Sequence, residues 1–95
     1  MIIREVAWMK LILIMIRDED KDKVQKELLV EGFTPTFIAT TGDFLQFGKS
    51  LFLLGIEGKE MERVKTIIFE NTKESQIKNG ELFRANLYVM GTDKY

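Results

Sequence analysis

A glycine-containing stretch, "TTGDFLQFGKS" (Thr40–Ser50), is similar to a phosphate-binding loop. A P-loop reads G-x-x-x-x-G-K-[S/T], and its backbone amides surround phosphate groups. Here five residues instead of four separate Gly42 from Gly48, although Lys49 and Ser50 follow as the motif requires. A P-loop also leads into a helix, whose N-terminal amides face the phosphate. Ser50 instead begins the apolar run "SLFLLGIE", which is typical of a strand, so we do not interpret the stretch as a P-loop.

Three alternating aspartates suggest a calcium loop, but the rest of that motif is missing. Asp18, Asp20 and Asp22 occupy the first, third and fifth positions of an EF-hand loop. The loop also needs glycine at its sixth position and glutamate at its twelfth, where this sequence has Lys23 and Leu29. Carboxylates at the start of a helix stabilise it through the helix dipole. We therefore interpret the acidic run as a helix start and expect no metal site.

The residue types that are missing exclude several chemistries. The chain has no cysteine and no histidine, which removes thiol nucleophiles, disulfides, Cys/His zinc sites and the usual general base near neutral pH. We find no other catalytic pair and do not expect an enzyme or a catalytic cofactor. Lys plus Arg number 14 and Asp plus Glu number 15, a formal charge of −1. Because no basic excess is available to neutralise phosphates, a general nucleic-acid binder is also not expected.

The length and the hydrophobic runs predict one small cytoplasmic domain. Ninety-five residues form a single domain by the usual size relation, and we take 1–95 as that domain. The most apolar run, "WMKLILIMI" (Trp8–Ile16), is far shorter than the ~20 residues that span a bilayer. It also lacks the cleavage site of a signal peptide and leads directly into charged residues. No membrane association is expected.

Hydrophobic periodicity predicts six main elements in the order βαββαβ. Strands are predicted where β-branched and aromatic residues form short runs, and helices where apolar residues recur every three or four positions. The predicted elements are strand Lys10–Ile16, helix Asp20–Glu31, strand Phe33–Thr40, strand Ser50–Glu57, helix Lys59–Glu74 and strand Leu82–Met90. Gly32 is the expected cap after the first helix, and Pro35 favours a sheet edge. This order predicts an α+β, ferredoxin-like fold: a four-stranded antiparallel sheet with both helices on one face.

Two of the predicted strands are apolar on both faces, which predicts a homo-oligomer. A sheet with one solvated face normally alternates apolar and polar residues along its strands. Neither "LILIMI" nor "LFLLGI" alternates in this way. Something must cover the face that the helices leave open, and a second copy of the chain is the simplest candidate.

The segment between the second and third strands is long for a hairpin and rich in phenylalanine. Hairpin loops commonly need two to five residues, and about eight lie here. Phe44 and Phe47 would be costly to expose without a partner. Two interpretations remain open: the rings pack on a neighbouring subunit, or an aromatic ring stacks on a base while nearby amides and hydroxyls hold phosphate or sugar.

The same region carries a resemblance to a known family. The stretches "MKLILIMIRDED", "EGFTPTFIATTGDFLQFGKSLFLLGIE" and "VKTIIFEN" resemble the PII-like cyclic di-AMP receptor proteins, and "ATTGxFLxxG" is a specific part of the match. The resemblance begins at Met9 and thus implies an N-terminal extension of residues 1–8, which an upstream start codon or a short added strand would explain. It implies a trimeric, ferredoxin-like signalling protein without catalytic activity. Its ligand would lie between adjacent subunits, against the loop that joins the second and third strands.

The resemblance also implies site residues, and the match is uneven. Thr36, Phe44, Leu45 and Gly55 match positions around the adenine, and Thr41 and Gly42 belong to an intact turn. Lys49 replaces an asparagine and could offset phosphate charge. Further departures are Gly32 for asparagine, Thr34 for arginine and Asp43 for a glycine. The segment before the last strand, "TKESQIKNGELFR", is also much shorter than in the family.

These observations predict a PII-like signalling receptor. It would be a homotrimer that binds a small nucleotide, cyclic di-AMP or another, at subunit clefts and relays the bound state to a partner protein. The alternative is an interaction module of the same fold that no longer binds nucleotide, with its loop phenylalanines docking on another protein.

Overall fold

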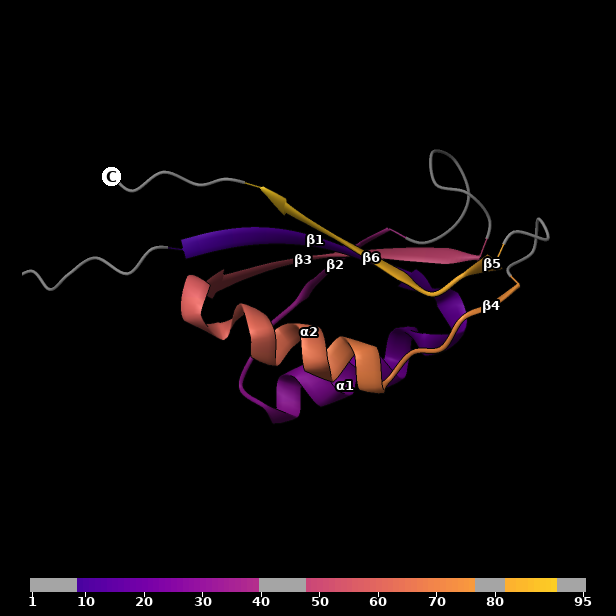
Figure 1. The fold of residues 1–95 in the computed structure, drawn as a ribbon, viewed down its shortest axis with the longest axis horizontal. Helices are drawn as coiled ribbons and strands as arrows, with labels where there is room; N and C mark the ends of the chain where they lie inside the picture. The colour runs from indigo at the N-terminus through magenta and orange to yellow at the C-terminus, as the bar shows by residue number, and fades with distance from the viewer. Residues whose placement is uncertain (1–8, 40–47, 77–81, 91–95) are drawn as a thin grey trace, which may run out of the picture.

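The computed structural model describes residues 9–39, 48–76 and 82–90, which form a four-stranded sheet with two helices on one face (Figure 1). The elements are β1 (Met9–Arg17), α1 (Lys21–Val30), β2 (Thr36–Ala39), β3 (Lys49–Glu57), α2 (Met61–Glu70), β4 (Ser75–Gln76), β5 (Leu82–Phe83) and β6 (Ala85–Met90). Short 3-10 turns, Asp18–Asp20 and Gly58–Glu60, lead into the two helices. The predicted ferredoxin-like order is confirmed, and the small β4–β5 hairpin is an addition to it.

The sheet is antiparallel, with the order β2-β3-β1-β6. The central strand β1 pairs with β3 from Met9 opposite Glu57 to Arg17 opposite Lys49, and with β6 on its other side. The edge position of β2 agrees with the sequence, because Pro35 directly precedes this strand and has no amide hydrogen to donate to a ladder.

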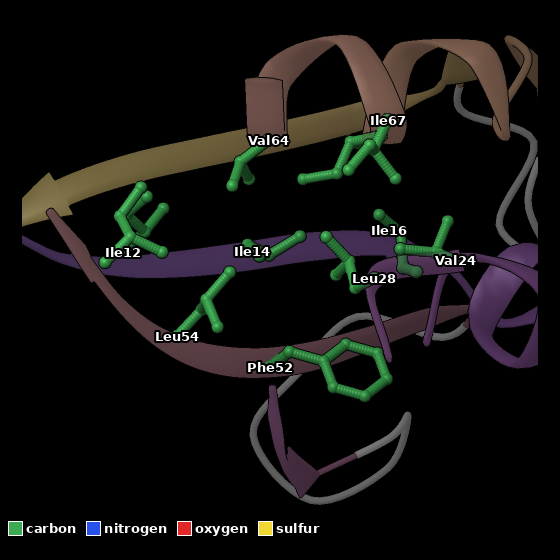
Figure 2. Packing of buried hydrophobic residues seen from close by; sticks show 11 residues of the cluster. Ile12, Ile14, Ile16, Val24, Leu28, Phe52, Leu54, Val64 and Ile67 are labelled. Atoms are coloured by element: carbon green, nitrogen blue, oxygen red, sulfur yellow. The ribbon is translucent and has the colours of Figure 1, made fainter. Parts of the chain in front are cut away.

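The core lies between the sheet and the helices (Figure 2). Every second residue of β1 and β3 points into it, since side chains alternate between the faces of a strand. The buried set comprises Ile12, Ile14, Ile16, Phe52, Leu54 and Ile56 from the strands, Val24 and Leu28 from α1, and Val64, Ile67 and Ile68 from α2. Val64, Ile67 and Ile68 are buried and Met61 is partly buried against the core, as expected for apolar residues that recur every three or four positions along the second helix.

Gly32 ends α1 as the sequence predicts. Its φ is +95°, in the region that glycine enters at low cost. The Gly32 amide donates to the Leu29 carbonyl at 3.0 Å, and the Phe33 amide donates to the Leu28 carbonyl at 2.8 Å. These two bonds form a Schellman motif, in which Phe33 also packs against the core.

Most of the predicted elements differ from the structure in their bounds. Strand β1 is longer by one residue at each end, and β3 begins one residue earlier, at Lys49. The first helix begins at Lys21 after its 3-10 turn, and β2 begins at Thr36 instead of Phe33. Helix α2 ends at Glu70 instead of Glu74, because the side chains of Asn71 and Thr72 bond back to the carbonyls four residues earlier, at 2.7 and 2.8 Å.

The last strand was wrongly predicted as one element. The chain breaks at Arg84, because β5 pairs with β4 in the hairpin while β6 joins the main sheet beside β1. Within the part of the chain that the structure describes, no helix is long and apolar enough to cross a membrane.

Candidate ligand-binding site

The face of the sheet away from the helices is apolar, and the described helices do not cover it (Figure 1). The β1 side chains that alternate with the core residues are Leu11, Leu13 and Met15, and all three are only partly buried. Tyr88 of β6 pairs with Leu13 and is 49% exposed. Strand β1 therefore carries apolar side chains on both faces, as the sequence predicts, and the described chain covers only one of these faces. We call this surface the open face.

Two predicted site residues meet on the open face. Thr36 of β2 lies directly opposite Leu53 of β3, and Gly55 follows Leu53 by two positions. Residues in this diagonal relation lie about 7–8 Å apart on the same face of a sheet. Thr36 and Gly55 are both exposed, so the structure brings together a hydroxyl group and a position without a side chain.

The glycine at position 55 is not required by the packing of the described chain. A Cβ added there would lie 3.9 Å from Leu11 Cδ1 and 3.9 Å from Met9 Cε, which is ordinary van der Waals contact. No positive φ requires a glycine there either. A glycine at this position leaves room for a ligand or a second subunit to approach the backbone from the open face.

Lys49 is placed apart from these two residues. It precedes Leu53 by four positions on β3, a distance of about 13 Å along a strand. Its side chain is buried, with 7% exposed, and Nζ lies 4.3 Å from the centroid of the Phe83 ring in the hairpin. The ammonium thus makes a cation–π contact with β5. The structure does not join Lys49 to Thr36 and Gly55 in one monomeric site.

The other four predicted site residues, Thr41, Gly42, Phe44 and Leu45, lie outside the described residues. The chain is described again from Gly48, whose φ is +90° and whose carbonyl accepts a hydrogen bond from the Asp18 amide at 2.8 Å. Gly48 therefore lies next to the end of β1. Lys49 and Ser50 belong to a strand, as our interpretation of the P-loop resemblance requires.

Sequence reasoning missed a buried ion pair at this same end of the sheet. Arg17 Nε and Nη2 each donate to a different oxygen of the Asp20 carboxylate, both at 2.9 Å. Nη1 donates to Glu19 at 2.6 Å and to the Ser75 hydroxyl of β4. The pKa of Arg17 is raised, first by the hydrogen bond to Asp20, while burial acts in the opposite direction. The sequence signal is an arginine directly after an apolar strand with an aspartate three positions later.

Asp18 completes this polar cluster. The Ser50 hydroxyl, fully buried on β3, donates to the Asp18 carboxylate. Two of the three aspartates considered for calcium are thus used by Arg17 and Ser50. Among the described residues, no three or more acidic side chains gather as a metal site would require. The cluster connects the end of β1, the start of β3 and the hairpin.

Known proteins are similar to this chain in sequence and in fold. The sequence family described as "Cyclic-di-AMP receptor" matches residues 9–91. A crystal structure of a functionally unknown protein from Pediococcus pentosaceus is 25% identical, with a TM-score of 0.73 over 95% of this chain and 97% of that one. The structure of Arabidopsis thaliana PII bound to citrate is 18% identical, with a TM-score of 0.57 over 92% of this chain and 77% of that one, and supports the shared fold alone.

Proposed function

Since the chain belongs to the cyclic-di-AMP receptor family, we propose that it is a PII-like signalling receptor for a small nucleotide of the cyclic di-AMP kind. The family match over residues 9–91 is the observation that carries this proposal. The protein acts by binding and not by catalysis, in keeping with a chain that has neither histidine nor cysteine. A cytoplasmic location and a partner protein that senses the bound state belong to the same proposal.

The receptor acts as a homotrimer whose subunits pack through the open face. Leu11, Leu13 and Met15 lie on this face, and removing such apolar side chains from water favours association. In such a trimer Thr36 and Gly55, which lie on the same face of the sheet, would lie at or near a boundary between subunits. This geometry supports a nucleotide site built from more than one copy of the chain.

Each proposed site residue has a role that its chemistry permits. The Thr36 and Thr41 hydroxyls hydrogen-bond to the nucleotide, and Phe44 and Leu45 enclose the base. Gly42 and Gly55 let the ligand approach the backbone closely. Lys49 offsets phosphate charge from its position at the start of β3.

One observation favours the alternative, an interaction module of the same fold without a nucleotide. Lys49 replaces a ligand-holding asparagine of the family, and its ammonium is engaged with Phe83. Gly32 replaces a second asparagine. Its φ of +95° explains why these two residue types exchange there, since both tolerate that conformation, but the glycine has no side chain with which to bind.

Calorimetry of the purified protein with cyclic di-AMP, ATP and AMP tests the proposal. We expect cyclic di-AMP to bind, and Thr36→Val to weaken that binding about tenfold, because one hydrogen bond to the ligand is lost. Thr66→Val is the matched control, since Thr66 is exposed on α2 and remote from the open face. It should leave the affinity unchanged.

Absence of heat and of a thermal shift with all three nucleotides would contradict the receptor proposal. The interaction module then remains, and Phe44→Ala distinguishes it. This variant should keep the oligomer and lose a partner that the wild-type protein retains in a pull-down.

A further inference from the structure

A groove between α2 and β6 lies on the helix side of the sheet, away from the open face. Its volume is about 540 Å³, within the range of small-molecule sites. Ile68 and Phe69 form its helix wall, and Ala85 and Leu87 of β6 form its floor. Figure 1 shows α2 lying along this edge of the sheet. None of Thr36, Lys49 and Gly55 lines the groove, so the proposed nucleotide site does not account for it.

Arg84 supplies the main polar group of the groove. Its guanidinium carbon lies 3.7 Å from the centroid of the Phe69 ring. Phe69 is 61% exposed. Nη2 donates to the Phe69 and Thr72 carbonyls at 2.6 and 3.0 Å, and Nε donates to the Thr72 hydroxyl at 3.1 Å. These bonds hold the guanidinium in one place against the end of α2.

The guanidinium retains capacity for an anion. Among the described residues, no carboxylate lies within 4 Å of it and no acceptor bonds to Nη1. Two other charges line the groove: Lys65, which contacts Glu62 at 3.4 Å, and Glu70, whose charge acts on Arg63. The lining therefore has two cations and one anion around an apolar floor.

We propose that this groove binds a small amphipathic anion with a flat apolar body and a single carboxylate. The body packs against Phe69, Ala85 and Leu87, while the carboxylate accepts hydrogen bonds from Arg84 Nη1. Guanidinium–carboxylate bonds are strong because both groups are charged, and the fixed position of Arg84 lowers the entropic cost of forming them. The site is independent of the nucleotide site, so either proposal can fail without the other.

An NMR titration of the intact protein with 2-naphthoate and 2-naphthamide tests the proposal. The two probes share one apolar body and differ in charge. We expect naphthoate to shift the methyl signals of Ile68 and Leu87. It should bind about tenfold more tightly than naphthamide, because it makes one charge-assisted hydrogen bond at a half-exposed site.

Two variants locate the binding. Arg84→Gln should remove the preference for naphthoate, with the circular dichroism spectrum reporting whether the fold survives the loss of the α2 contacts. Thr66→Trp leaves Arg84 in place and fills the groove from an exposed position, and it should abolish binding of both probes. Arg63→Gln removes a charge of α2 that does not line the groove and that pairs with Glu31, and it should leave the preference for naphthoate unchanged.

Three outcomes would overturn the proposal. One is equal affinity for naphthoate and naphthamide, or no binding of either at millimolar concentration. A second is a set of shifted signals that excludes Ile68 and Leu87. The third is a Thr66→Trp variant with a changed subunit number in native mass spectrometry, because the groove would then be a contact between subunits.

Discussion

At the scale of single residues, the structure depends on how charge is balanced at the end of β1. Arg17 and Lys49 are directly opposite each other in neighbouring strands, and like charges in that position repel. Asp20 and Glu19 neutralise Arg17, while the Lys49 ammonium lies against the Phe83 ring. Arg17 also bonds to Ser75, so the balance of charge connects the hairpin to the sheet.

Replacing Arg17 should therefore destabilise the protein strongly. Arg17→Gln leaves the buried Asp20 carboxylate without its cation, and we expect the free energy of unfolding to fall by about 3–5 kcal/mol. Urea denaturation measures this change. Lys23→Gln is the control, since Lys23 is exposed in the first turn of α1 and should alter stability by less than about 0.5 kcal/mol. Equal effects of the two substitutions would show that the pair contributes little.

At the scale of elements, the two helices end at their C-termini in different ways. A positive φ at Gly32 ends α1, whereas side chains of Asn71, Thr72 and Arg84 satisfy the last carbonyls of α2. The first ending is local and readable from sequence. The second combines Asn71 and Thr72 with Arg84, a residue beyond the hairpin that a local pattern cannot reveal.

Gly32→Ala tests the first of these endings. A side chain at φ +95° is strained, and we expect a loss of about 1 kcal/mol in the free energy of unfolding, measured in urea. Gly55→Ala is the matched substitution at a glycine without positive φ, where the added Cβ meets only ordinary contacts. It should change monomer stability by less than about 0.5 kcal/mol. A Gly32→Ala protein as stable as the wild type would refute the role given to this cap.

At the scale of the whole molecule, the unequal faces of the sheet are the main feature. The helices and the core occupy one face, and the other presents Leu11, Leu13 and Leu53 without cover from the described chain. Contiguous apolar surface of this kind marks an interaction site in most proteins. The same asymmetry places the proposed nucleotide site and the α2–β6 groove on opposite sides of the sheet.

Leu13→Glu should abolish self-association. A carboxylate at the centre of the open face would be buried without a partner in the oligomer, so we expect native mass spectrometry to report monomers in place of the trimers proposed for the wild type. Val30→Glu introduces the same charge at a position on α1 that is 68% exposed, and it should leave the trimer intact. A trimeric Leu13→Glu protein would mean that another surface joins the subunits.

The sequence by itself determined the order of the main elements, the helix faces that are buried and the cap at Gly32, because periodicity and backbone preference act over a few neighbouring residues. Thr36 and Gly55 of the candidate site came from the resemblance to the receptor family, and the predicted strands correctly located them on β2 and β3. Only the tertiary structure decided the partners of Arg17, Lys49 and Arg84. Arg17 bonds to Ser75, 58 positions away, and Lys49 lies against Phe83. Such contacts depend on which chain ends the fold brings together, and no local pattern encodes that.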